Sequence, residues 1–381
     1  MITRSYWNEK ILNAWDKRSL IWLSGIRRVG KTTLAKMLPD TLYLNCDLPS
    51  VEVRLADPEF FFNSVEKNKR IIFDEIHKLQ DPSRLLKIAT DEYPDIKVIA
   101  TGSSTLEATK KFSDSLAGRK IMINLCPFLW SEIKNHKMEV GLEKRLLKGG
   151  LPQALLASHK DDDFFAEWLD SYFARDIQEL FEIRNKSGFI SMLKLLLNIS
   201  GGILDIDYVS KQCKITRLTA MSYLQAMIVS HTIMIIPPFF GGGTREIVKR
   251  PKVYGFDTGF VTYCRGWDSL RQEDLGGLWE HMVLDEIRSS VDKDRIHYWR
   301  DKSGREIDFV VQINSEKVDV IECKFNPDKI NISAIKEFRR LYPSGDNYCI
   351  SPFVDGVYER KIEDHIIKIN SNYSKEINKI V

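Results

Sequence analysis

The sequence has few cysteines, no long apolar run and little net charge. Its six cysteines are widely scattered over 381 residues, without the paired spacing of a zinc site or a disulfide framework. No stretch approaches the roughly 18 to 20 apolar residues of a membrane span, and the N-terminal residues lack the apolar core of an export signal. These absences argue against a disulfide-stapled or membrane-spanning protein and predict a protein of the reducing cytosol.

The nearly balanced charge also gives no indication of a nucleic-acid partner. Lys and Arg number 56 against 53 Asp and Glu, a net charge of +3, so any basic surface must be local. The 43% apolar and 29% charged content is typical of a globular protein. At roughly 150 residues per domain, the length predicts two or three domains, which the motifs below place at residues 1–150, 151–265 and 266–381.

The first 150 residues have the pattern of an α/β domain. Short, largely β-branched apolar runs occur at residues 20–23, 42–44, 71–73, 98–100 and 121–123. The stretches between them are long enough for helices, so the pattern predicts a buried parallel sheet with helical crossovers.

A glycine-rich segment, GIRRVGKTT, follows the first of these runs and precedes the helix-compatible LAKML. Glycines allow the backbone N–H groups to turn toward a triphosphate. Lys31 is expected to reach the β and γ phosphates, Thr32 to complete the shell of Mg²⁺, and Thr33 mainly to pack. The candidate ATP-binding residues are therefore Gly25, Ile26, Arg27, Arg28, Val29, Gly30, Lys31, Thr32 and Thr33.

Two carboxylates end a later apolar strand, RIIFDE. Asp74 is expected to hold Mg²⁺ through water, and Glu75 to orient or deprotonate the attacking water. Thr101 and Ser103 follow the next strand and are candidate γ-phosphate sensors, although ordinary helix capping explains the serine equally well. Arg119 is the best arginine-finger or sensor candidate, with a structural salt bridge as the open alternative.

The middle of the chain combines a helical core with a predicted winged helix. Apolar residues recur at helical spacing over residues 151–200, and two short helices, a strand, a Gly-rich turn and a second strand follow over residues 203–257. Arg175 and Asp176 either contact nucleotide or form an ion pair. A local basic face for DNA phosphates, or a protein-docking or purely structural face, is predicted at Lys214, Arg217, Arg245, Lys249, Arg250 and Lys252.

The C-terminal part carries acidic residues in a pattern suited to divalent metal. Glu280 lies on a helix-like stretch, and Asp308 and Glu322 lie on strand-like stretches. Lys324 is two residues from Glu322 and so shares its strand face. The three carboxylates are candidate ligands for one or two divalent ions, and Lys324 is a candidate for activating water or stabilising a phosphorane. This is the chemistry of phosphodiester hydrolysis.

The motifs together resemble a prokaryotic family of AAA-type ATPases that carries a C-terminal DUF4143 domain. The resemblance rests on GIRRVGKTTL, RIIFDEIHK, VIATGSS, SLAGR, PFLWSEI, GGLPQALL, YFARDI, RPKVYGFDTGF and LWEHMVLDEI. It implies a P-loop core, a winged helix and a restriction-endonuclease-like C-terminal fold. Glu280, Asp308, Glu322 and Lys324 then match the PD-(D/E)xK nuclease motif.

Three hypotheses remain open. In the first, the protein hydrolyses ATP to ADP and phosphate with Mg²⁺, and this rearranges a DNA-binding, nuclease-like domain that is either a metal-dependent nuclease or a binding platform. In the second, it is a nucleotide-switched regulator that binds protein or DNA through an inactive nuclease-like fold. In the third, it is an AAA motor, for which a homo-oligomeric ring would supply the arginine finger.

Overall fold

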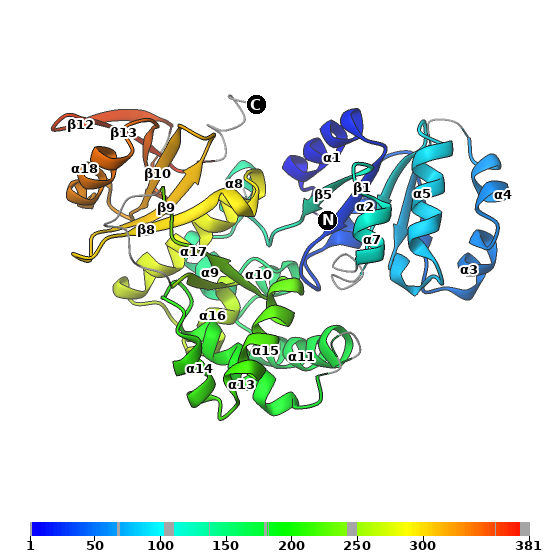
Figure 1. The fold of residues 1–381 in the computed structure, drawn as a ribbon, viewed down its shortest axis with the longest axis horizontal. Coiled ribbons are helices and arrows are strands. Elements are labelled where there is room, and N and C mark those ends of the chain that lie inside the picture. The colour runs from blue at the N-terminus through cyan, green and yellow to red at the C-terminus, as the bar shows by residue number, and fades with distance from the viewer. Residues whose placement is uncertain are drawn as a thin grey trace. The chain divides into compact units, whose positions relative to one another are not determined.

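The structure, a computed structural model (Figure 1), describes residues 2–66, 69–102, 110–136, 138–178, 181, 183–241, 250–354 and 356–373. The predicted candidates Ser103, Arg245 and Lys249 lie outside these residues. The chain divides into two compact units. Unit 1 consists of Met1–Cys126, Ser171–Ile183 and Val229–His231, and unit 2 consists of Pro127–Asp170, Arg184–Ile228 and Thr232–Val381.

Unit 1 contains the predicted parallel sheet. Its described strands are β1 (Leu20–Ser24), β2 (Thr41–Asn45), β3 (Arg70–Asp74), β4 (Lys97–Ala100) and β5 (Lys120–Asn124). All four pairings are parallel, in the order β2-β3-β4-β1-β5. Every residue of β1 is buried, as expected for a central strand that is covered on both faces. The sequence-based prediction of an α/β fold is confirmed.

Described helices precede and connect these strands. They are α1 (Ser5–Lys17), α2 (Lys31–Lys36), α3 (Pro49–Leu55), α4 (Pro58–Asn63), the short turn η1 (Ile76–Lys78), α5 (Pro82–Glu92) and α7 (Lys110–Ser115). The aspartates before α4 and α5 each accept a backbone N–H of the first turn, and a proline follows each, which is a favourable helix start. Trp22 of β1 packs against Phe112 with ring centroids 4.6 Å apart, so helix and sheet share one core.

Unit 2 begins with a helical part. Its helices are α8 (Trp130–Asn135), α9 (Leu142–Lys148), α10 (Pro152–Leu156), α11 (Asp162–Tyr172, whose last two residues fall in unit 1), α13 (Lys186–Asn198), α14 (Ile206–Gln212), α15 (Arg217–Val229, whose last residue also falls in unit 1) and α16 (Thr258–Cys264). The strands β6 (Ile233–Ile236) and β7 (Lys252–Gly255) pair antiparallel after α15. Two helices followed by a two-stranded ribbon is the element order predicted for a winged helix.

The C-terminal part of unit 2 is a mixed sheet with helices. The strands are β8 (Ile296–Arg300), β9 (Glu306–Gln312), β10 (Val318–Cys323), β11 (Asn347–Ile350), β12 (Tyr358–Ile362) and β13 (His365–Asn370), in the order β12-β13-β11-β10-β9-β8. The remaining elements are α17 (Gln272–Ser290), η3 (Lys293–Arg295), η4 (Pro327–Lys329) and α18 (Ile332–Leu341). Trp279 of α17 donates its indole N–H to the carbonyl of Ile350, 2.9 Å away, which fixes this helix on the sheet.

The packing divides the chain at places that the apolar pattern did not indicate. Residues 127–150, expected with the first domain, belong to unit 2, where Gly150 N donates to Asp257 Oδ2 at 2.6 Å and Arg145 Nε donates to Phe128 O at 2.8 Å. The π-helical segment η2 (Phe173–Gln178) instead belongs to unit 1. None of the described helices is long and apolar enough to cross a membrane.

Candidate functional site

The glycine-rich loop lies between β1 and α2 and has a strongly turned backbone. Gly25, Arg28 and Gly30 have φ angles of 138°, 61° and 100°. A Cβ atom on Gly25 would lie 2.6 Å from the carbonyl oxygen of Leu125, so only glycine fits there. The loop therefore turns sharply at the carboxyl end of a parallel strand, where α/β sheets bind their ligands.

The ammonium group of Lys31 lies over this loop. Its Nζ donates to the carbonyl oxygens of Gly25, 2.8 Å away, and Ile26, 3.3 Å away. Burial lowers the pKa of Lys31, although the nearby carboxylates of Glu75 and Asp176 oppose this. A cation bound only to neutral loop carbonyls can exchange these partners for phosphate oxygens.

Asp74 lies at the centre of a cluster of hydroxyl groups at the ends of neighbouring strands. Its Oδ2 accepts from Thr32 Oγ1 at 2.8 Å and Tyr43 OH at 2.7 Å, and its Oδ1 accepts from Thr101 Oγ1 at 2.5 Å. Asp74 is only 4% exposed. The hydroxyl of Thr32 and the carboxylate of Asp74 are hard oxygen donors held side by side, a donor set that fits Mg²⁺.

Glu75 follows this cluster in a left-handed backbone conformation, with φ 57° and ψ 40°. Its N–H donates to Thr101 Oγ1 at 3.1 Å, and its carboxylate lies 3.4 Å from Nδ1 of His77. The side chain of Glu75 is 48% exposed. A non-glycine residue in this conformation is strained, and such strain is frequent at functional sites.

The other predicted loop residues have different environments. Ile26 and Val29 are buried, so they anchor the loop in the core. Arg27 forms an ion pair with Asp176 of η2 at 3.4 Å, so the partner of that aspartate lies in the loop and not in a helix. Thr33 is exposed, so the expectation that it packs is wrong. The short helix α2 buries Leu34 and Ala35 instead.

Arg119 is held in a bidentate ion pair. Its Nε lies 2.6 Å from Asp91 Oδ1, and its second terminal nitrogen lies 3.0 Å from Oδ2. This hydrogen bond lowers the pKa of Asp91. The pair is the structural salt bridge that the sequence left open as the alternative to an arginine finger.

One further contact near the loop was not predicted. His231 has a left-handed backbone, with φ 61°, and its Nε2 lies 2.9 Å from Oγ of Ser24, the residue before Gly25. The residues between them span most of the helical part, so no local motif connects the two positions. Only the fold brings this histidine to the glycine-rich loop.

A second polar cluster lies in the C-terminal part of unit 2. Lys324 Nζ lies 2.7 Å from Glu322 Oε2 and 3.1 Å from Asp308 Oδ2, and the N–H of Cys323 also donates to Asp308 Oδ2, at 2.7 Å. The antiparallel pairing of β9 with β10 brings these residues together. The sequence motif is therefore a spatial cluster.

Glu322 is the most buried member of this cluster. It is 1% exposed, and its Oε1 has no hydrogen-bond partner among the described residues. Burial, with the neighbouring charge of Asp308, raises the pKa of Glu322 to about 8. Although burial opposes it, the carboxylates of Asp308 and Glu322 raise the pKa of Lys324.

Glu280 of α17 joins the cluster through β7. Lys252 Nζ lies 2.9 Å from Glu280 Oε1 and 2.6 Å from Glu306 Oε1, and Tyr254 also donates its hydroxyl to Glu280 Oε1. Burial and the charge of Asp308 raise the pKa of Glu280, against the effect of Lys252. The roles of Lys252, Tyr254 and Glu306 at this cluster were not predicted from the sequence.

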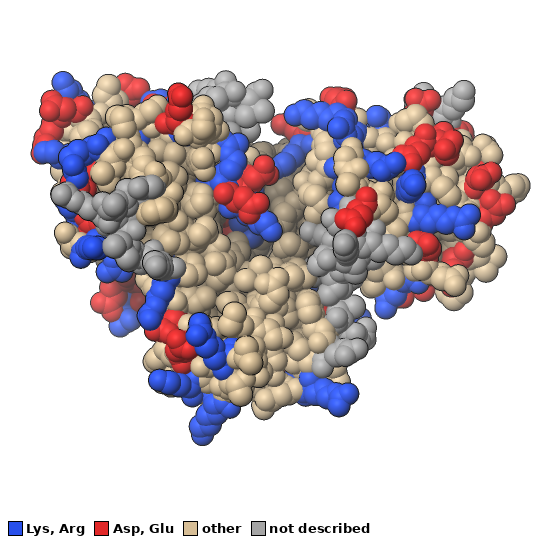
Figure 2. Space-filling view, viewed as in Figure 1, with Lys and Arg blue, Asp and Glu red and all other residues tan. Residues whose placement is uncertain are grey.

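These contacts correct the predicted basic face. Lys252 is 3% exposed and bound to two carboxylates, so it cannot lie on a DNA-facing surface. Arg250 pairs with Asp205 at 2.6 Å, and Arg217 with Asp207 at 3.4 Å, while Lys214 is exposed. Among the residues that Figure 2 draws in colour, acidic and basic groups are interspersed on the visible face of each unit.

The carboxylates Glu280, Asp308 and Glu322 offer the hard oxygen donors that a divalent cation prefers. The buried, unpartnered Oε1 of Glu322 is a free acceptor for such an ion. Within the part of the chain that the structure describes, however, no three His, Cys, Asp or Glu side chains are already grouped as a metal site. The donor types therefore fit a metal ion. In this structure the carboxylates are bound instead to the ammonium groups of Lys252 and Lys324.

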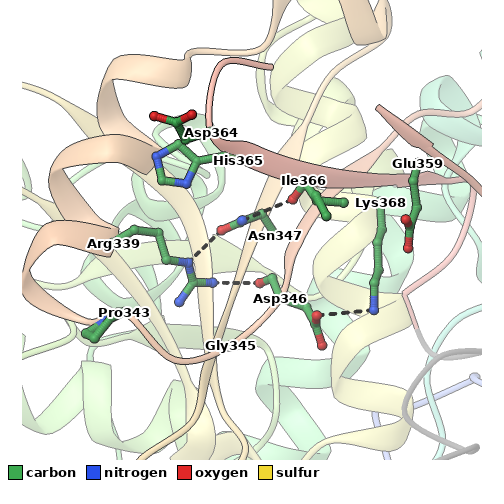
Figure 3. A pocket seen from close by; sticks show the side chains of 10 residues that line it. All are labelled: Arg339, Pro343, Gly345, Asp346, Asn347, Glu359, Asp364, His365, Ile366 and Lys368. Atoms are coloured by element: carbon green, nitrogen blue, oxygen red, sulfur yellow. Dashed lines mark hydrogen bonds and ion pairs between the residues drawn. The ribbon is translucent and has the colours of Figure 1, made fainter. Parts of the chain in front are cut away.

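A pocket of about 590 Å³ lies elsewhere on the C-terminal sheet (Figure 3). Arg339 donates to Asn347 Oδ1 and to the carbonyl of Asp346, each at 2.7 Å. Lys368 lies 3.2 Å from Asp346 Oδ1. The cationic groups of Arg339 and Lys368 are therefore already engaged by neighbouring residues of the pocket.

Three family models match consecutive parts of the chain. An AAA domain matches residues 17–134, a domain of unknown function (DUF8612) matches residues 140–271, and a domain of unknown function (DUF4143) matches residues 275–370. The boundaries between the matches lie close to those between the P-loop part, the helical part and the C-terminal sheet.

Similar proteins include two with uncharacterised functions. Rv2008c of Mycobacterium tuberculosis is 24% identical over 318 residues, covering 80% of this chain and 70% of that protein. MJ1544 of Methanocaldococcus jannaschii is 23% identical over 342 residues, covering 81% and 75%. A solved structure, the Walker-type ATPase PABY2304 of Pyrococcus abyssi, has a TM-score of 0.44 and 17% identity, covering 70% of this chain and 96% of that one.

The AAA match and the parallel sheet cover the same first part of the chain. The two matches to the rest of the chain are to domains of unknown function and indicate no activity. Residues 17–134, which match an AAA domain, contain the five-stranded parallel sheet, and matches to a DUF8612 and a DUF4143 domain follow in the same chain.

Proposed function

We propose that the chain binds and hydrolyses ATP at the loop of residues 25–33. The observation that carries this proposal is the contact of Thr32 and Thr101 with Asp74, at 2.8 and 2.5 Å, beside the loop over which Lys31 lies. Lys31 would exchange loop carbonyls for phosphate oxygens, and Thr32 and Asp74 would hold Mg²⁺, which neutralises charge that develops on the phosphates.

Glu75 is the proposed base in this reaction. Its exposed carboxylate would orient a water molecule toward the γ-phosphorus and accept its proton, while the bond from the γ-phosphorus to the β–γ bridging oxygen breaks and ADP leaves. Thr101 donates to Asp74 and accepts from the N–H of Glu75, so it would hold the metal-binding Asp74 and the base Glu75 in a fixed relative position.

Two substitutions test the ATPase proposal. Lys31→Ala should abolish ATP turnover because it removes the cation for the phosphates, whereas Glu75→Gln should bind ATP and hydrolyse it at least about 100-fold more slowly. Binding is measured with a fluorescent ATP analogue and turnover by phosphate release. Glu92→Gln, at the end of α5, is a control at an exposed glutamate. Normal turnover in both test variants would refute the assignment.

We propose second that the C-terminal cluster is a divalent-metal-dependent phosphodiesterase site that acts on DNA. The observation that favours it is the convergence of Asp308, Glu322 and Lys324 within 3.1 Å contacts, with one buried carboxylate oxygen left unpartnered. Asp308, Glu322 and Glu280 would hold the ion, which when bound would polarise the phosphate and activate water. Lys324 would neutralise charge on the phosphate.

The test uses plasmid and short single- and double-stranded oligonucleotides with Mg²⁺ or Mn²⁺, with and without ATP. Asp308→Ala and Lys324→Ala should lose nicking and keep ATP turnover, because the two clusters lie in different units. Lys302→Ala, an exposed lysine between β8 and β9, is the control. Absence of cleavage by the wild type, with normal ATP turnover, would favour a nucleotide-switched regulator with an inactive nuclease-like fold.

A further inference from the structure

Strand β7 brings two side chains from the middle of the chain to the C-terminal cluster. Lys252 and Tyr254 are two residues apart and therefore lie on the same face of the strand. Both are buried, and both bind Glu280 of α17. Residues 252 and 254 fall in the stretch that matches DUF8612, whereas residue 280 falls in the stretch that matches DUF4143.

The two donors bind the same oxygen atom. Oε1 of Glu280 accepts from Lys252 Nζ at 2.9 Å and from the hydroxyl of Tyr254. Oε2 has no hydrogen-bond partner or ion pair among the described residues. Hydrogen-bond partners on one oxygen of a glutamate help to orient it and leave the other oxygen available to a ligand.

Glu280 also interacts electrostatically with the predicted metal ligands. The charge of Asp308 acts on both Glu280 and Lys252, and that of Glu280 acts on Glu322. Lys252 additionally binds Glu306, the first residue of the strand that carries Asp308. β7 therefore contacts both Glu280 and Glu306 through Lys252.

We propose that Lys252 and Tyr254 are positioning residues for the C-terminal site, which fix Glu280 so that its free oxygen completes the carboxylate set of Asp308 and Glu322. This inference rests on the proposed metal-dependent function. It makes the site a composite of two family domains, so the stretch that matches DUF4143 lacks two of the donors that shape it.

Tyr254 offers the cleaner test of the two. Removing Lys252 also removes a positive charge beside the carboxylates, which by itself favours cation binding and obscures the loss of orientation. Tyr254→Phe removes only one hydroxyl. Loss of such an outer partner of a ligand weakens metal binding by about 10- to 100-fold.

A second tyrosine provides the matched control. Tyr298 is also buried, and its hydroxyl donates to the carbonyl oxygen of Arg250, 2.5 Å away, rather than to a carboxylate of the cluster. Its ring lies 5.5 Å from Lys252 Nζ, so it occupies the same region of unit 2. Tyr298→Phe therefore removes a comparable hydrogen bond without touching Glu280.

The experiment measures Mn²⁺ binding to the full chain by electron paramagnetic resonance, without nucleotide. Binding at this site is defined as the part lost in Asp308→Ala. Tyr254→Phe should bind Mn²⁺ at least about 10-fold more weakly than the wild type, whereas Tyr298→Phe should change the affinity less than about twofold. In a Glu280→Gln background, Tyr254→Phe should have no further effect, because the residue that it orients no longer binds the ion.

The outcomes separate the inference from the proposed function. Unchanged Mn²⁺ affinity in Tyr254→Phe, or the same loss with and without Glu280→Gln, would overturn the positioning role while the metal site stands. Equal binding by wild type and Asp308→Ala would remove the metal site and the inference together. Thermal melts of both phenylalanine variants report folding, and an equal fall in Mn²⁺ affinity for both would also overturn the role, since it would reflect general loosening.

Discussion

At the scale of single residues, one hydroxyl group connects the two halves of the proposed nucleotide site. Thr101 is fully buried, donates to Asp74 and accepts from the N–H of Glu75. Thr101→Val keeps the shape and leaves both partners unsatisfied, so we expect a loss of about 1–3 kcal/mol in the free energy of unfolding. ATP turnover should fall at least about 10-fold. Urea denaturation and phosphate release measure the two effects.

Thr90 provides the comparison for this substitution. Its hydroxyl donates to the carbonyl of Lys87 on the exposed side of α5. Thr90→Val should change the stability by less than about 0.5 kcal/mol and leave turnover unaffected. If Thr101→Val behaved like Thr90→Val, the hydroxyl would not be the link between Asp74 and Glu75.

Glu286 carries a pH-dependent contribution to stability. It is 2% exposed, accepts from N and Oγ of Ser131 at 2.8 and 2.9 Å, and burial raises its pKa from 4.5 to about 7. Because the folded state then holds the proton more tightly than the unfolded state, stability is greatest below pH 4.5 and falls as the pH rises through 7.

Glu286→Gln should remove this contribution, since the amide can still accept from Ser131 N and donate to its Oγ. Between pH 5 and pH 8 the wild type should lose more stability than the variant, by an amount on the order of 3 kcal/mol. Denaturation at both pH values measures the difference, with the exposed Glu316→Gln as control. An equal pH dependence in wild type and Glu286→Gln would contradict the prediction.

At the scale of elements, the turn from β1 into the glycine-rich loop depends on glycine for two reasons. Gly25 has φ 138°, and an added Cβ would lie 2.6 Å from the carbonyl of Leu125. Gly118 also has a positive φ, 72°, but an added Cβ would meet nothing within 4 Å. Gly118→Ala should therefore cost about 1–2 kcal/mol from backbone strain alone.

Gly25→Ala should cost at least about 2 kcal/mol more than Gly118→Ala, because the strand beside the loop must also move. It should weaken ATP binding as well, since the loop backbone would no longer follow the same path. Thermal unfolding and titration with a fluorescent ATP analogue measure these effects. Equal costs for the two substitutions would mean that the contact with Leu125 relaxes freely.

At the scale of the whole molecule, the segment η2 belongs to unit 1, which also contains the glycine-rich loop, although the two are far apart in the sequence. Asp176 of η2 pairs with Arg27, and its charge also acts on Lys31. A carboxylate at this position repels a triphosphate, so Asp176→Asn should tighten ATP binding by about 5-fold. Asp170→Asn, in an exposed pair with Lys186, should have no effect. Weaker ATP binding by Asp176→Asn would contradict this electrostatic account.

The sequence by itself determined the strands of the first domain and, in each cluster, the residues that belong to a local motif. Strand positions follow from short apolar runs, because a buried parallel strand needs apolar residues on both faces. The glycine-rich loop and the Asp74–Glu75 pair could also be recognised, because each consists of residues that are adjacent in the chain. The same holds for Glu322 and Lys324, which share one strand face.

Only the tertiary structure decided which distant residues meet. The strand order places Tyr43 beside Asp74, and no local pattern encodes that order. Lys252 looked like a surface cation because its neighbours in the chain are basic, yet β7 turns it onto Glu280 and Glu306, where burial is tolerated since both carboxylates balance its charge. A local motif indicates the chemistry that its residues can perform. The contacts and the burial of each residue depend on packing between segments that are far apart in the chain.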